Sequence, residues 1–67
     1  MDYNDIKKFV EQRGFRTLAE IKANFDKEDQ EVLRAQLDYL VSRGNLKKVR
    51  YVDPQRVDVG ELFVTPV

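Results

Sequence analysis

The chain contains no cysteine and no histidine. These absences exclude disulfide bonds, thiol chemistry, zinc and iron–sulfur sites built on those ligands, and imidazole general bases. No apolar run approaches the roughly 18 residues that a membrane-spanning helix needs, so we expect no membrane insertion. The opening segment, residues 1–5, is polar and acidic, unlike a secretion signal. A cytoplasmic location is therefore predicted.

The composition is that of a small globular protein. The 67 residues are 42% hydrophobic and 36% charged, and twelve basic side chains balance twelve acidic ones. One domain over residues 1–67 with a small core is predicted, and no overall field draws the chain to nucleic acid or to a membrane surface. The hydroxyl groups have no histidine to activate them, and the glycines are isolated rather than arranged as a phosphate loop. We therefore expect no enzymatic activity and no cofactor.

The first two helices are indicated by apolar spacing and by end signals. Asn4 is a candidate N-cap for a helix that runs to about Arg13, and Gly14 follows as a stop. Thr17 and Glu20 match a capping box at the start of a second helix, which ends at Asn24 or Phe25. The apolar rows of these helices are Ile6, Phe9 and Val10 in the first, and Leu18, Ile21 and Phe25 in the second.

The third predicted helix is the longest. Asp26 is its candidate N-cap, Glu28 and Asp29 lie in the next turn beside the positive end of the helix dipole, and the helix runs to about Arg43 before Gly44. Its apolar row is Leu33, Leu37, Leu40 and Val41. An oxygen cluster at Asp26, Glu28 and Asp29 lacks the spacing and the central glycine of a calcium loop.

The pattern then changes to that of strands. Residues 46–52 alternate as a strand, residues 53–56 favour a turn, and a second strand lies within residues 57–65, with Gly60 as a candidate bulge. The link at residues 15–16 is extended and could add a short strand. The order predicts an α+β fold of the winged helix-turn-helix type, with three helices, a turn at residues 25–27 and a C-terminal β-hairpin wing.

Five segments also carry a family resemblance. They are residues 6–14 (IKKFVEQRG), 17–21 (TLAEI), Phe25, 33–41 (LRAQLDYLV) and 44–49 (GNLKKV). On these residues, the stretch from Ile6 to Arg50 resembles the FeoC-like family of small winged-helix proteins linked to ferrous-iron transport.

The resemblance implies a small cytoplasmic regulator. Members of the family have been proposed either to regulate transcription or to bind the cytoplasmic part of the iron transporter. Many carry a cysteine cluster in or after the wing that binds an iron–sulfur cluster. The corresponding region here, residues 52–65, has no cysteine, so that role does not carry over.

Charge is distributed unevenly along the chain. Residues 20–38 carry six acidic and three basic side chains, whereas residues 39–56 carry five basic and one acidic. On a helical wheel, the outward face of the third helix presents Glu28, Glu31, Asp38 and Tyr39, with Ala35 and Ser42. Entry of this face into a major groove would bring carboxylates toward phosphates, which bind mainly Lys and Arg. We therefore expect this helix not to read DNA.

The hairpin is the better candidate for nucleic acid. Lys47, Lys48 and Arg50 lie beside Tyr51, and Arg56 lies across the turn. These cations either protect an edge strand from pairing or contact phosphate or an acidic protein.

Two side chains of the third helix have more than one interpretation. Arg34 is spaced to pair with Glu31 at i, i−3 and with Asp38 at i, i+4. Tyr39 is either an outward interface residue or packs under the hairpin.

These patterns predict a non-catalytic module that binds a protein partner through the third helix and the wing, and the resemblance implies that this module is a regulator of ferrous-iron transport. The resemblance points to the transporter's cytoplasmic domain as that partner. DNA binding through the basic wing, strengthened by dimerisation, is the alternative, and a purely structural homodimer is the third reading.

Overall fold

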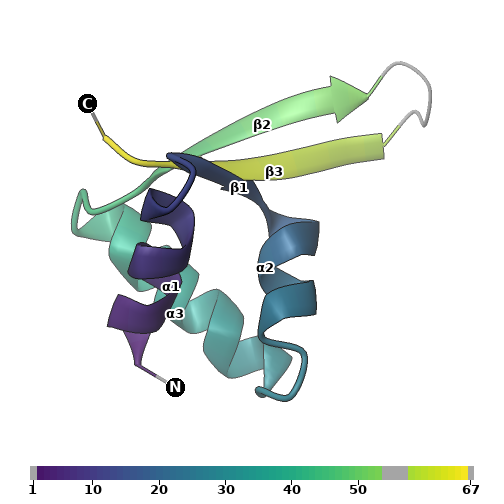
Figure 1. Cartoon of the computed structure of the whole chain (residues 1–67). Coiled ribbons are helices and arrows are strands. Elements are labelled where there is room, and N and C mark those ends of the chain that lie inside the picture. The colour runs from purple at the N-terminus through teal and green to yellow at the C-terminus, as the bar shows by residue number, and fades with distance from the viewer. Residues whose placement is uncertain (1, 54–57, 67) are drawn as a thin grey trace.

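The computed structural model describes residues 2–53 and 58–66 as a small α+β domain, with helices packed on one side of an antiparallel sheet (Figure 1). The elements in chain order are α1 (Tyr3–Glu11), β1 (Phe15–Thr17), α2 (Leu18–Asn24), α3 (Gln30–Ser42), β2 (Lys47–Asp53) and β3 (Asp58–Val64).

Helix α1 begins earlier than the sequence analysis predicted. Its N-cap is Asp2, not Asn4, and the backbone N–H of Asp2 donates to Oδ2 of Asp5 at 3.2 Å. Asp and Asn are equally good N-cap residues, so local pattern alone does not choose between positions 2 and 4. The earlier start brings Tyr3 into the helix, where its ring packs against α3.

The predicted capping box at the start of α2 is confirmed. The backbone N–H of Glu20 donates to Oγ1 of Thr17 at 3.1 Å, and the backbone N–H of Thr17 donates to Oε1 of Glu20 at 3.3 Å. Two amide groups that a helix start leaves without partners are thus satisfied reciprocally. Since Thr17 also ends β1, this box fixes the point where strand becomes helix.

Helix α3 begins later than predicted, because Asp29 rather than Asp26 is its N-cap. Oδ1 of Asp29 accepts from the backbone N–H of Glu31 at 2.8 Å and from that of Val32 at 3.4 Å. Glu28 and Asp29 therefore precede the helix instead of lying in its first turn, and the link from α2 is longer than residues 25–27.

The predicted stops of α1 and α3 are confirmed at Gly14 and Gly44. Their φ angles are +84° and +78°, a left-handed conformation that side chains with a Cβ rarely adopt. The N–H of Gly14 donates to the carbonyl of Val10 at 2.9 Å, which closes the last turn of α1.

The sheet has the order β1-β3-β2, so β3 is central. The short strand that the sequence suggested at residues 15–16 is real and pairs with β3 from Phe15 opposite Val64 to Thr17 opposite Leu62. Beyond β3, the N–H of Thr65 donates to the carbonyl of Gly14 at 3.0 Å. The sheet therefore joins the end of α1 to the last described residues.

Gly60 is not a bulge. It lies directly opposite Tyr51 in an unbroken register that runs from Lys47 opposite Val64 to Asp53 opposite Asp58. A Cβ at position 60 would overlap the Tyr51 side chain at Cζ, Cε1 and the hydroxyl oxygen. Glycine is present because the tyrosine ring crosses directly over the backbone of β3.

The core consists of eight fully buried side chains contributed by the helices, the segment after α3 and β3. They are Ile6, Val10, Ile21, Leu33, Leu37, Leu40, Leu46 and Phe63. The remaining members of the predicted helical rows, Phe9, Leu18, Phe25 and Val41, are partly buried against this core.

Strands β2 and β3 extend past the helices (Figure 1). In β2, the alternation predicted from the sequence is present, yet Val49 and Tyr51 are exposed, as is Val52. Directly opposed residues share a face, so Val49 and Tyr51 lie with Leu62 and Gly60 on the face turned away from the buried Phe63. Of the predicted turn at residues 53–56, Asp53 is instead the last residue of β2, and residues 54–56 lie outside the described residues.

Candidate functional site

The outer face of α3 carries exposed carboxylates, as the helical wheel predicted. Glu31 and Asp38 are exposed, and Glu28 is half-buried just before the helix. Asp29 differs from these residues because its carboxylate is occupied by the N-cap hydrogen bonds. Glu31 and Asp38 therefore give the solvent side of α3 a negative character over two helical turns.

Arg34 does not make the ion pairs that its spacing predicted. Its Nη2 lies 3.1 Å from Oε1 of Glu61 in β3. Glu61 is on the helix side of the sheet, since it is two residues from the buried Phe63 in β3 and side chains at i and i+2 of a strand share a face. A pair between residues 27 apart in sequence thus replaces the local pairs with Glu31 and Asp38, and it ties α3 to the sheet.

The basic residues of the hairpin are divided between two faces of the sheet. Lys48 and Arg50 lie opposite Phe63 and Glu61 on the helix side, whereas Lys47 lies opposite Val64 on the other side. All three cations are exposed, and Arg56 lies outside the described residues. The described cations of β2 therefore do not form one continuous surface.

Tyr39 does not pack under the hairpin. It is 44% exposed, and its ring lies 5.2 Å from that of Tyr3, centroid to centroid, at an angle of 55°. The guanidinium carbon of Arg43 lies 5.9 Å from the Tyr39 ring. Of the two interpretations drawn from sequence, Tyr39 fits the outward, interface-type position.

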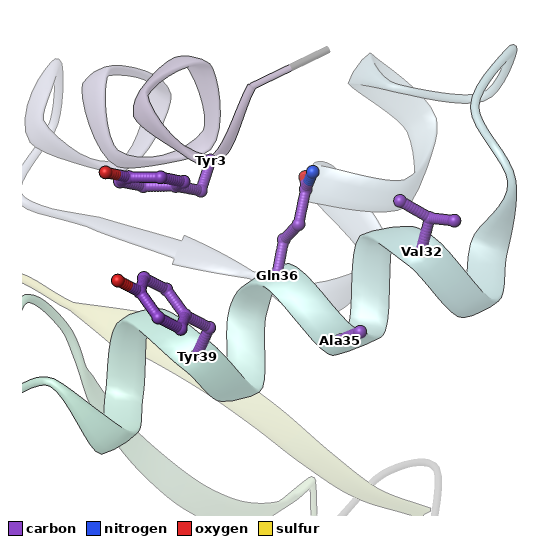
Figure 2. Close-up of a pocket in the computed structure, with 5 residues that line it drawn as sticks. All are labelled: Tyr3, Val32, Ala35, Gln36 and Tyr39. Carbon is purple, nitrogen blue, oxygen red and sulfur yellow. The ribbon is translucent and has the colours of Figure 1, made fainter.

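An open apolar hollow of about 360 Å³ lies between the start of α1 and α3, and we call it the α1–α3 hollow. Its lining residues are Tyr3, Val32, Ala35, Gln36 and Tyr39. Figure 2 shows the two tyrosine rings facing each other from the two helices, with Gln36 rising from α3 between Tyr39 and Val32.

Sequence reasoning missed Tyr3 and Val32 as members of this surface. A signal for Tyr3 was present, because Tyr3, Ile6 and Val10 follow the i, i+3, i+7 spacing of one helix face. Val32 had no comparable signal, since it lies beside the leucine row of α3 and not in it. Both side chains are exposed, Tyr3 by 38% and Val32 by 47%.

Glu20, a residue of the scaffold, has a carboxyl group with a shifted pKa. The backbone N–H of Thr17 lowers the pKa of Glu20 below its ordinary value of 4.5, and the side chains of Arg16, Thr17 and Arg13 add to this effect against partial desolvation. The carboxylate that these groups hold charged lies at the joint between β1 and α2 and does not line the α1–α3 hollow.

Metal ligation and membrane insertion can be assessed for residues 2–53 and 58–66. Within them, no three or more carboxylate side chains form a group that could hold a metal ion. Asp26, Glu28 and Asp29 therefore do not form such a group. No helix in that part of the chain combines the length and apolar character needed to cross a membrane.

The arrangement therefore offers surfaces for binding: an acidic and apolar face on α3, and an exposed, divided set of cations on β2. No family model, no curated protein and no solved structure matches this chain.

Proposed function

We propose that the domain is a winged helix-turn-helix in which α2 and α3 form the helix-turn-helix and β2–β3 form the wing. The element order and the β1-β3-β2 strand order support this assignment. The extension of β2 and β3 past the helices supports it further (Figure 1).

The proposed function is that of a small non-catalytic regulator that binds a protein partner through α3 and the wing. One observation carries the proposal: the outer face of α3 presents Glu31 and Asp38 next to exposed Val32 and Tyr39. Carboxylates repel the phosphates of a DNA groove, whereas an exposed tyrosine beside apolar side chains is typical of protein interfaces.

The resemblance of residues 6–50 to FeoC-like proteins supports a specific partner, the cytoplasmic domain of a ferrous-iron transporter. The absence of cysteine in residues 52–65 means that a protein contact, and not an iron–sulfur cluster, would carry the regulation.

A titration tests this function. The isotopically labelled protein is titrated with the cytoplasmic domain of the ferrous-iron transporter from the same organism, and amide shifts are followed by NMR. We expect saturable shifts at Glu31, Asp38 and Tyr39. The double change Glu31→Lys with Asp38→Lys is expected to weaken binding at least about tenfold, because reversed charges at an interface oppose association.

The matched control is Asp26→Lys, a charge reversal at an exposed residue that precedes α3. It is expected to leave affinity unchanged. Absence of binding, or equal weakening by the control, would contradict the proposed partner and surface.

DNA binding by the wing is the second candidate, favoured by the exposure of Lys47, Lys48 and Arg50. Fluorescence anisotropy with a mixed-sequence duplex at about 50 mM salt tests it, because phosphate contacts are strongest there. We expect no binding at micromolar protein. Tight binding that falls steeply with salt and disappears in the double change Lys47→Glu with Lys48→Glu would favour DNA instead.

A further inference from the structure

The α1–α3 hollow is a concave apolar surface that no described part of the chain covers. Three of its four lining side chains on α3, Val32, Ala35 and Tyr39, follow i, i+3, i+7 spacing and so form one row along the helix, with Gln36 beside the row. Seven residues of helix span about 10 Å. Ala35 at the middle of the row leaves room for close approach by another chain.

The geometry suits a helix better than an extended peptide. Extended peptides usually bind by adding a strand to a sheet edge, but the walls here are the helices α1 and α3, whose backbone groups are already paired within each helix. Side chains spaced at i, i+4 and i+7 on an incoming helix cover the same length of about 10 Å as the row from Val32 to Tyr39.

The charges around the hollow indicate the chemistry of the incoming helix. Glu31 and Asp38 lie on α3 next to the row, and both are exposed. Two cations lie on the opposite side of the row: Arg43 near Tyr39, and Lys7 one turn after Tyr3 on α1, where it pairs with Glu11. The rim is therefore negative on its α3 side, where Glu31 and Asp38 complement Lys and Arg.

The same charges argue against a second copy of this chain as the occupant. In a two-fold dimer the same patch lies on both sides of the interface. Such a dimer would bring the acidic rims of the two copies toward each other, and like charges across an interface oppose association.

We propose that the α1–α3 hollow binds an amphipathic helix of a partner protein, with apolar side chains seated between Tyr3 and Tyr39 and with flanking Lys or Arg facing Glu31 and Asp38. This inference rests on the proposed protein-binding function and specifies the segment that the partner supplies.

Two synthetic peptides of about 18 residues, long enough to hold a helix, test the proposal. They share one leucine stripe and differ only in their flanks, which are Lys and Arg in one and Glu in the other. The basic peptide is expected to bind, with NMR shifts centred on Tyr3, Val32 and Tyr39. The acidic peptide is expected to bind at least about tenfold more weakly.

Paired variants separate the apolar and the charged contributions. Val32→Asn is expected to weaken binding of the basic peptide about tenfold. Val49→Asn is the matched control, since Val49 is about equally exposed but lies on the outer face of the sheet. The double change Glu31→Gln with Asp38→Asn is expected to reduce the difference in affinity between the basic and the acidic peptide. Circular dichroism confirms that each variant is folded.

Three results would overturn the inference: equal binding of the two peptides, no saturable binding of the basic peptide, or shifts centred on β2. The inference would also be overturned if sedimentation showed concentration-dependent dimers that Val32→Asn abolishes, because the occupant of the hollow would then be a second copy of this chain. If the transporter domain binds with shifts at Glu31, Asp38 and Tyr39 but none at Tyr3 or Val32, the proposed function stands and this inference fails. If the basic peptide binds and the transporter domain does not, the hollow stands and the partner is another protein.

Discussion

A single guanidinium group, that of Arg16, joins three elements of the domain. Its Nε donates to the carbonyl of Phe9 at 3.0 Å, its Nη1 to Oε2 of Glu20 at 3.3 Å and its Nη2 to Oε1 of Gln12 at 3.3 Å. Its guanidinium carbon also lies 3.9 Å from the centre of the Phe9 ring. Arginine suits this position because its planar fork donates in several directions while it stacks on an aromatic ring.

The charge of Glu20 is expected to make stability depend on pH. Because its pKa is lowered in the folded protein, the charged form stabilises the fold fully above the ordinary pKa of 4.5, and this contribution is lost as pH falls through the folded pKa. Glu20→Gln keeps a capping-box acceptor but removes the charge. Urea unfolding from pH 7 to pH 3 should therefore show a difference from the wild type that shrinks below about pH 4.5. A difference that stays constant with pH would contradict this assignment.

The contact of Tyr51 with Gly60 gives a test in which the sign of the effect changes. Gly60→Ala is expected to destabilise the protein by up to about 1 kcal/mol, because the new Cβ overlaps the exposed ring of Tyr51 and displaces it from its place across the strand. In the Tyr51→Ala background the same change should be neutral or stabilising by up to about 1 kcal/mol, because alanine is better than glycine inside a strand. Thermal denaturation of the four proteins in this cycle measures both effects. Equal destabilisation in the two backgrounds would show that the ring is not the cause.

Among the elements, α3 depends for its stability on its N-cap Asp29, where the sequence analysis had predicted Asp26. Asp29→Ala is expected to destabilise the protein by about 0.5–2 kcal/mol, because the amide groups of Glu31 and Val32 lose their acceptor. Asp26→Ala is the control and should change stability by less than about 0.5 kcal/mol, since Asp26 is exposed and caps no helix. Chemical denaturation measures both. The reverse order would restore Asp26 as the cap.

The element ends show which sequence signals are decisive. Gly14 and Gly44 were identified correctly because a left-handed residue after a helix strongly favours glycine. The box at Thr17 and Glu20 was identified because its two halves constrain each other. The predicted N-caps Asn4 and Asp26 are wrong, because Asp2 and Asp29 lie a few positions away and cap a helix equally well. The choice between such positions depends on which helix start buries the apolar row.

The candidate surface was only partly visible in the sequence for a related reason. The exposure of Glu31, Asp38 and Tyr39 followed from the helical period alone. The partner of Arg34 did not, because Glu61 is brought to it by the sheet and not by local spacing. The packing of Tyr3 on Tyr39 likewise depends on how α1 docks on α3, which no local pattern encodes.

For the whole molecule, the small core sets a narrow margin of stability. A domain of this size gains only about 3–5 kcal/mol from such a core. Leu37 is a core residue that is only 1% exposed. Leu37→Ala is expected to lower the free energy of unfolding by about 2–5 kcal/mol. Most of the variant should therefore be unfolded at 25 °C, as the loss of chemical-shift dispersion in its NMR spectrum would show. The exposed Val32→Ala should remain folded. A well-folded Leu37→Ala protein would mean that stability comes from elsewhere.

The central position of β3 has a consequence for synthesis on the ribosome. Strands β1 and β2 both pair with β3 and not with each other, so neither can complete its hydrogen bonds until residues 58–64 have left the exit tunnel. A nascent chain arrested while residue 64 is still inside the tunnel lacks both the template for the sheet and the buried Phe63. Its helices of 9, 7 and 13 residues are too short to be stable without that packing. Final compaction must then follow release of the last strand, in a single late step.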